Sequence, residues 1–345
     1  MKLFKRMICL IMLFALVCPV FGCSAANVGK NRDGKPLIGI SMCSLLVERW
    51  YKDRNAFTAE LARLDADVIV QNANNDVELQ AEQIDDLLDR GIDVLIVIPV
   101  SSTAFKDQLS RALRSGVKVI SYERLIENIH TDAYYSFDNI RVGELLALGL
   151  LDGMTEGELV LINGDRNDHN TELYREGYMH ILQPHIDSGR IRIAGDVYCA
   201  DWEVEHAYNE VERLLGENVH IDGIIATNDS LAGSAIQVLL EKGIADSVVV
   251  VGQDGDLAAY QRIVEGVQHA TVYKNYTKLA SAAALAAYRM SGDKPFAYSE
   301  KIDNGGEMIK YYKLSPQLVT KDNIDKVVID GGVYTADQVY MNVIG

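Results

Sequence analysis

The sequence predicts an α/β protein made of two doubly wound lobes, each a parallel sheet covered by helices, that are joined by a hinge. The first observation behind this prediction is length, because a chain of 345 residues exceeds what one hydrophobic core usually serves. The second is composition, since 48% hydrophobic and 24% charged residues are typical of a folded globular chain. The third is an alternation of short apolar runs with amphipathic stretches, which starts twice along the chain.

The first series of elements begins at Pro36. Apolar runs rich in β-branched residues predict its strands, at Leu37–Met42, Asp67–Gln71, Val94–Val100 and Val117–Tyr122. Apolar residues at helical spacing predict its helices, at Arg49–Leu64, Val77–Arg90 and Ala104–Ser115. Strands that alternate with helices of this length predict βαβ units and therefore a parallel sheet.

The second series repeats the same alternation. Its strands are predicted at Glu158–Asn163, Ile191–Cys199, Ile221–Thr227, Val248–Gly252 and Ala270–Tyr273. Its helices are predicted at Thr171–Ile186, Glu203–Leu215, Leu231–Lys242 and Ala258–Glu265. The segment Tyr134–Asn139 separates the two series, and we expect the chain to cross between the lobes there.

The last part of the chain completes both lobes. The segment Lys278–Met290 is predicted to be a helix, and its small residues indicate that it is buried. The tail Lys310–Tyr340 is expected to be irregular, with short strands. The predicted division assigns 36–138 plus about 276–302 to the N-terminal lobe, and 139–275 plus about 303–345 to the C-terminal lobe.

The N-terminus has the features of an export signal. Basic residues precede an apolar run, Met7–Phe21, that is too short to remain as a membrane span. The end of this run resembles a bacterial lipobox, which implies that Cys23 is lipidated and becomes the mature N-terminus. We therefore expect a signal peptide over 1–22 and a lipid-anchored linker over 23–35. The alternative is an ordinary secretory peptide in which Cys23 is incidental.

Charge, hydropathy and cysteine content exclude several classes of protein. The formal net charge is −16, and no concentrated basic face indicates nucleic-acid binding. No later apolar run is long enough to span a bilayer, so we expect an extracytoplasmic body held at the cell membrane by lipid alone, in a periplasm or on the outer surface. Beyond the signal and Cys23 the chain carries Cys43 and Cys199, which we expect to be buried free thiols, with one disulfide as the alternative.

Polar side chains follow the predicted strands. In open parallel sheets ligands bind beyond the carboxyl ends of the strands, where the loops face one crevice. We expect both tryptophans of the chain to lie in such loops, Trp50 in the first lobe and Trp202 in the second. The candidate binding residues are Arg49, Trp50, Glu123, Arg124, Asp168, Asn170, Trp202, Asn228, Asp254 and Lys274.

The chemistry of these side chains favours a neutral polyol. Their cationic and anionic groups are balanced, whereas a site for an ion would carry surplus charge of the opposite sign. Amides such as Asn170 and Asn228 both donate and accept, as sugar hydroxyls require. An indole face suits the C–H face of a sugar ring. The alternative for each loop is ordinary capping, since Asn228 could serve only as a helix N-cap.

Short phrases spread over the chain carry a resemblance to a known family. They are ERWYKDR at Glu48–Arg54, SFDN at Ser136–Asn139, DSGRI at Asp187–Ile191, TNDS at Thr227–Ser230, GQDGDLA at Gly252–Ala258 and VYK at Val272–Lys274. From about Pro36 to about Tyr334 the sequence resembles type I periplasmic sugar-binding proteins of ABC importers, in particular those for D-xylose. The resemblance departs at Glu123, where the family has Asp, and at His169, where Asn is usual.

The resemblance implies roles for individual residues. The groups expected to hydrogen-bond the sugar are Arg49, Arg124, Asn170, Asn228, Asp254 and Lys274. Trp202 is implied to be a stacking platform, with Asp168 and Trp50 in the same wall. The implied function is an extracytoplasmic receptor that holds D-xylose, or a similar aldopyranose, between the lobes and delivers it to an ABC permease. The alternative is a sensor whose closed form docks on the extracellular domain of a membrane kinase.

Enzyme motifs are missing from the sequence. It contains no G-x-S-x-G elbow, no H-E-x-x-H and no P-loop. The acids Asp254 and Asp256 resemble the start of a calcium loop, but Ala259 stands where that loop needs glycine. We therefore expect no enzymatic activity, no cofactor and no metal site. The expected partners are a monosaccharide and a membrane permease or kinase.

Overall fold

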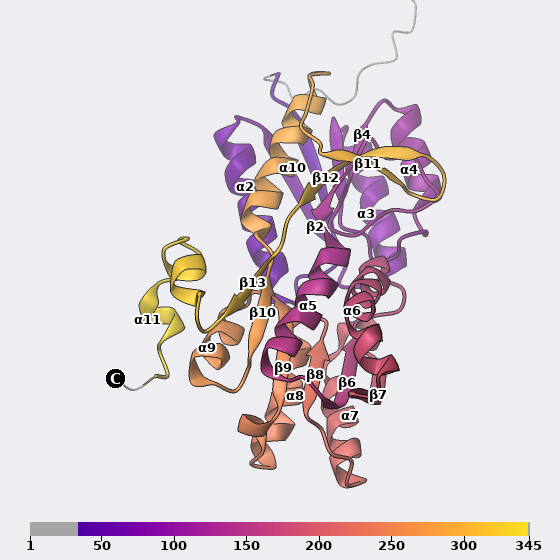
Figure 1. Ribbon diagram of the computed structural model, residues 1–345. Helices are drawn as coiled ribbons and strands as arrows, with labels where there is room; N and C mark the ends of the chain where they lie inside the picture. Colours follow the sequence, from indigo (N-terminus) through magenta and orange to yellow (C-terminus); the bar gives the residue numbers. More distant parts are fainter. Residues whose placement is uncertain (1–33, 344–345) are drawn as a thin grey trace, which may run out of the picture.

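The computed structural model describes residues 34–343, which form two α/β lobes (Figure 1). In this range the first lobe contains a seven-stranded sheet with the order β11-β12-β5-β4-β3-β1-β2. Its strands are β1 Leu37–Met42, β2 Asp67–Asn72, β3 Val94–Val97, β4 Lys118–Tyr122, β5 Ala133–Phe137, β11 Glu300–Asp303 and β12 Met308–Leu314. Neighbouring strands pair in parallel except β11 with β12. This is the parallel sheet that the first series predicts.

Alternate residues of the central strands face two different helical layers of the first lobe. Its helices are α2 Glu48–Arg63, α3 Val77–Asp89, α4 Lys106–Arg114 and α10 Tyr276–Met290. Ile38 and Ile40 of β1 pack with the layer of α2 and α10, while Leu95 of β3 packs with α3 and α4. The small residues of α10 are buried in this contact, among them Ala283 and Ala287.

The second lobe has the same construction. Its sheet has the order β13-β10-β9-β8-β6-β7 and is parallel apart from β13. Its strands are β6 Gly157–Asn163, β7 Ile191–Tyr198, β8 Gly223–Ala226, β9 Val249–Asp254, β10 Ala270–Tyr273 and β13 Gln317–Thr320. Its helices are α5 Asn139–Gly153, α6 His169–Asp187, α7 Val204–Gly216, α8 Asp229–Glu241, α9 Leu257–Glu265 and α11 Ala336–Val339. Shorter turns lie at Ala200–Trp202, Ala245–Ser247 and Asp325–Ile329.

The predicted fold class is confirmed, and each strand and helix of the two predicted series is present with ends shifted by a few residues. Two local differences stand out. The expected crossover Tyr134–Asn139 is mostly strand β5, and the chain leaves the first lobe at Asp138. Helix α5 comes directly after it and was not predicted. Its residues are buried on more than one side, between α6 and the sheet, so the sequence lacks a clear amphipathic pattern.

The predicted lobe division is wrong for one segment. We placed about 303–345 in the C-terminal lobe, but β12 pairs with β5 of the first sheet, with Tyr311 opposite Tyr134. The chain therefore crosses again between Leu314 and Gln317, where β12 leads into β13 (Figure 1). Side-chain periodicity identifies a strand but not its partner, because pairing is made by backbone hydrogen bonds that any sequence can form.

Two further expectations concern cysteines and the membrane. Cys43 and Cys199 are both buried and free, as predicted. None of the helices between residues 34 and 343 has the length and apolar character needed to cross a bilayer. The expected signal peptide over 1–22, the lipidation of Cys23 and most of the expected linker 23–35 lie outside the described residues.

Candidate functional site

A cavity of about 480 Å³ lies between the two lobes. All ten candidate binding residues line it: Arg49, Trp50, Glu123, Arg124, Asp168, Asn170, Trp202, Asn228, Asp254 and Lys274. The reason is the shared direction of the parallel strands. Glu123 and Arg124 directly follow β4, Asp254 ends β9 and Lys274 follows β10, so each lobe presents the carboxyl ends of its strands to the other.

Glu123 lies at the centre of the polar contacts. Its Oε1 accepts hydrogen bonds from Nη1 of Arg49 at 2.8 Å and Nζ of Lys274 at 3.1 Å. The side chain is almost completely buried. Burial alone would raise the pKa of Glu123, but the two adjacent cations, Arg49 and Lys274, outweigh it and lower that pKa to about 2. The group is therefore an anion at neutral pH.

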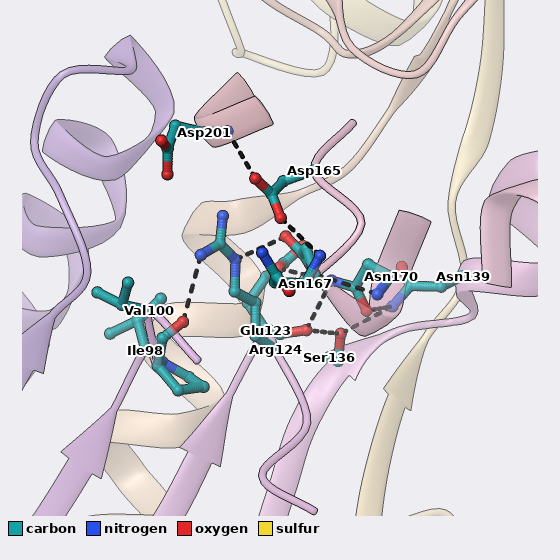
Figure 2. Close-up of polar contacts among 12 residues, drawn as sticks. Ile98, Val100, Glu123, Arg124, Ser136, Asn139, Asp165, Asn167, Asn170 and Asp201 are labelled. Atoms are coloured by element: carbon teal, nitrogen blue, oxygen red, sulfur yellow. Dashed lines mark hydrogen bonds and ion pairs between the residues drawn. The ribbon is translucent and has the colours of Figure 1, made fainter. Parts of the chain in front are cut away.

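The backbone around Glu123 is held as firmly as its side chain. Its φ is 64°, a left-handed conformation that is costly for a residue with a Cβ. The hydroxyls of Tyr134 and Ser136 donate to its carbonyl oxygen at 2.9 and 2.7 Å. Asn170 Nδ2 also reaches that oxygen and donates to the carboxylate at 2.9 Å, while Asn139 donates to Asn170 Oδ1 at 2.7 Å (Figure 2).

Arg49 is fixed by three acidic groups. Its Nε donates to Asp53 at 3.2 Å, and its Nη1 lies 3.5 Å from Oδ1 of Asp254 in addition to its bond with Glu123. Nη2 of the same guanidinium is buried and has no hydrogen-bond partner. Lys274 completes the group, with Nζ 3.0 Å from Asp254 Oδ1. The free guanidinium nitrogen leaves a donor beside the cavity that a hydroxyl of a ligand could satisfy.

Arg124 and Asp168 join the lobes on another side of the cavity. Nε of Arg124 lies 2.8 Å from Oδ2 of Asp168, and its Nη1 donates to the carbonyl of Pro99 at 3.2 Å. Asp168 also caps α6, since its Oδ1 accepts from the backbone N–H of Asn170. Burial raises the pKa of Asp168, and the charge of Arg124 opposes this shift only in part.

Trp202 lies in the short turn after β7 with a φ of 60°. Its ring packs against Gly164, where a Cβ would come within 2.2 Å of the ring atoms. Only glycine therefore leaves room for the indole at this place. The indole Nε1 is buried and has no hydrogen-bond partner.

The expected loop position of Trp50 is wrong. Trp50 lies in the first turn of α2, is 6% exposed, and packs in the hydrophobic core of the first lobe. The guanidinium carbon of Arg49 lies 4.6 Å from its ring centroid. The helix predicted over Arg49–Leu64 already contained Trp50, and the observed helix begins one residue earlier, at Glu48. The tryptophan therefore supports Arg49 as well as lining the cavity.

Sequence reasoning missed some lining residues. Tyr174 also lines the cavity, and its hydroxyl accepts a hydrogen bond from Lys274 Nζ at 3.1 Å. It follows Asn170 by one helical turn, a spacing that could have indicated it. Gln253 lines the cavity as well and has a buried Oε1 without a partner. His169 instead pairs with Glu127, its Nδ1 lying 3.0 Å from Oε1.

The site therefore combines balanced charges with groups that donate and groups that accept. Among the ten candidate residues that line the cavity, the three cations and three carboxylates neutralise one another. Three exposed acidic side chains also line this cavity and give its lining as a whole an excess of negative charge: Asp201, Glu203 and Glu205. In the part of the chain that the structure covers, no three His, Cys, Asp or Glu residues are grouped to hold a metal ion. The chemistry present is that of hydrogen-bonding an uncharged polar molecule.

Comparisons with known proteins agree with this geometry. The sequence pattern of the periplasmic binding protein domain matches residues 38–295. The chain is 40% identical to a D-xylose-binding periplasmic protein of Haemophilus influenzae over 304 residues, 88% of this chain and 92% of the relative. It is also 40% identical to a D-xylose-binding periplasmic protein of Escherichia coli K12 over 299 residues, 86% of this chain and 90% of the relative. A carbohydrate transporter solute binding protein from Chloroflexus aurantiacus, solved in complex with D-glucose, has a TM-score of 0.82 at 28% identity and covers 87% of this chain and 97% of its own.

Proposed function

The chain belongs to the periplasmic binding protein domain family, and on that basis we propose that it binds D-xylose, or a similar aldopyranose, between its lobes. Members of this family and fold are binding proteins and not enzymes, as the sequence predicted. The proposed role is to deliver the sugar to an ABC importer.

The observation that carries this proposal is the convergence of ten polar and aromatic side chains from both lobes on one cavity. A ligand there would contact Arg49 and Arg124 of the first lobe together with Asn228 and Asp254 of the second. It would bind the closed arrangement more tightly than an open one and so shift the population toward closure. A permease could then recognise the closed surface.

The names of two relatives, each 40% identical, support D-xylose as the first sugar to test. Isothermal titration with D-xylose, arabinose, ribose, glucose and galactose tests the proposal, and we expect the strongest binding with D-xylose. Several sugars must be tested because Glu123 stands where the family that the sequence resembles has Asp. Its side chain is one methylene longer, which could change the sugar that fits. Absence of binding to every sugar would overturn the proposal.

The lipid anchor is a separate part of the proposal and depends on Cys23. We expect wild-type cells to incorporate labelled fatty acid into the protein and to retain it in the membrane fraction. Cys23→Ser should abolish both, while Cys43→Ser should leave both unchanged, since Cys43 is buried in the fold. Release of the wild-type protein without label would contradict the anchor.

The sensing alternative uses the same closed form with a different partner. Delivery predicts that the sugar-loaded protein binds reconstituted permease and stimulates its ATPase. Sensing predicts instead that the loaded protein binds the extracellular domain of a kinase. Measuring both interactions with and without sugar separates the two roles.

A further inference from the structure

Three neighbouring strand ends of the second lobe supply residues of the cavity. Asn228 follows β8, Asp254 ends β9 and Lys274 follows β10. Asp229 lies directly beneath them, is 1% exposed and does not line the cavity itself. We infer that Asp229 is a positioning residue whose ionised carboxylate ties the start of α8 to the loop after β9 and to β10, so that its protonation weakens sugar binding. This inference rests on the proposed function of the cavity.

The carboxylate of Asp229 joins the start of α8 to the loop after β9 and to Thr271, near the start of β10. Its Oδ2 accepts from the backbone N–H groups of Gly255 at 2.9 Å and Asp256 at 3.1 Å. The same oxygen accepts from the hydroxyl of Thr271 on β10 at 2.8 Å. Asp254, immediately before these amides, has a φ of 110°. A conformation so unfavourable for a residue with a side chain persists only where the surroundings hold it.

The backbone of β9 is shaped to admit this carboxylate. A Cβ on Gly252 would lie 2.3 Å from Oδ1 of Asp229, so no other residue at 252 leaves the carboxylate in place. Gln268 Nε2 donates to that Oδ1 at 2.9 Å. Arg262 Nε donates to Gln268 Oε1 at 2.8 Å, and this bond fixes which end of the amide faces Asp229. In each of these hydrogen bonds the carboxylate of Asp229 is the acceptor. A proton on one of its oxygens would therefore take the place of an accepted hydrogen bond.

The charged and titratable groups facing Asp229 are few. Arg262 and Tyr260 face it from α9, Asp256 faces it from the loop after β9, and β10 presents only the neutral Thr271. Burial raises the pKa of Asp229 to about 6, although Arg262 and the hydrogen bonds oppose that shift. Protonation therefore falls in the mildly acidic range.

Stability and affinity should respond to this protonation with opposite signs. Because the folded-state pKa of Asp229 lies above its unfolded value, ionisation of this group costs stability above pH about 6, and the cost disappears as the pH falls. If Asp229 had only a structural role, its protonation would lower the sugar affinity only where it also lowered the stability of the fold. If Asp229 positions the binding residues, its protonation in acid lowers the affinity while its contribution to stability becomes more favourable.

The test is titration with D-xylose from about pH 8 to about pH 5, with thermal unfolding measured in parallel. For the wild-type protein we expect affinity to fall about tenfold as the pH passes about 6. Asp229→Asn should bind about tenfold more weakly at pH 8 and show no step near pH 6. Asp246→Asn, an exposed acid on the same lobe, is the matched control and should behave as wild type.

Thr271→Val is a second variant that keeps the volume and removes one hydrogen bond to Asp229. Because that bond lowers the pKa of Asp229, its loss should move the affinity step to higher pH. Any one of three results would overturn the inference. They are a wild-type affinity that is constant over this pH range, an affinity step that persists in Asp229→Asn, and an affinity step that stays at the same pH in Thr271→Val. Failure of the wild-type protein to bind any sugar at pH 8 would instead overturn the proposed function.

Discussion

Glu123 and Lys274 meet across the two lobes, with Oε1 of the carboxylate 3.1 Å from Nζ of the ammonium. Lys274 is 1% exposed, and its other acidic contact is Asp254 at 3.0 Å. The pair joins the end of β4 in the first sheet to the end of β10 in the second. A buried charge of this kind is stable only while its partners remain, because the interior solvates it poorly. The contact between the lobes at Glu123 and Lys274 therefore depends on the charges of both side chains.

Glu123→Gln should destabilise the ligand-free protein at neutral pH by on the order of 3 kcal/mol. The pKa of Glu123 is lowered to about 2, below its unfolded value, so the ionised group contributes stability at neutral pH. That contribution is lost as the pH falls from about 4.5 toward 2. Urea unfolding of both proteins at several pH values measures the difference.

The stability difference between wild type and Glu123→Gln should shrink toward zero at the acid end of the series. A difference that stays constant with pH would mean that the substitution acts through packing and not through charge. Glu205→Gln, an exposed acid at the rim of the cavity, is the control and should change stability little at any pH.

Arg124→Ala should weaken sugar binding by about 2–4 kcal/mol. The change removes a buried donor and leaves Asp168 without the cation that lies 2.8 Å away. Isothermal titration gives the affinity. Arg141→Ala removes an exposed arginine of α5 and should leave it unchanged. Less than tenfold weakening by Arg124→Ala would show that the sugar does not use this group.

Gly164→Ala should displace Trp202 and reduce affinity at least about tenfold. The new Cβ would come within 2.2 Å of the indole ring, which cannot compress and must move. Sugar titration with tryptophan fluorescence as the readout follows both consequences. Gly216→Ala is the matched control, because a Cβ there meets no atom within 4 Å. Full affinity in Gly164→Ala would exclude Trp202 as a contact.

The thiols of Cys43 and Cys199 should be unreactive in the native protein. Both are buried and free, and burial raises the pKa of Cys199 to about 12 and that of Cys43 in the same direction. A chain that begins at Ser24 lacks the three cysteines that precede this residue and retains Cys43 and Cys199. A chromogenic thiol reagent should react with neither of these two thiols until denaturant is added. Rapid labelling without denaturant would mean that the fold opens around one of them.

The sequence predicted much of the fold because alternating strands and helices are a local property. The ten candidate residues chosen from the sequence all line one cavity, because the loops after parallel strands lie at a common edge of the sheet. The sequence placed Trp50 in a loop although the helix predicted over Arg49–Leu64 already contained this residue, because the exact start of a helix depends on capping and packing. It did not find Tyr174, whose place at the cavity depends on how α6 is turned against its neighbours.

By itself the sequence determined the class of architecture, the positions of polar groups at strand ends and the balance of their charges. Only the tertiary structure decided which strand β12 joins, that Glu123 faces Lys274, 151 residues away, and that Asp229 lies under the cavity. The physical reason is the range of the forces involved. Periodicity and propensity act between residues a few positions apart, whereas strand pairing and buried charge contacts depend on distances that exist only once the whole chain has packed.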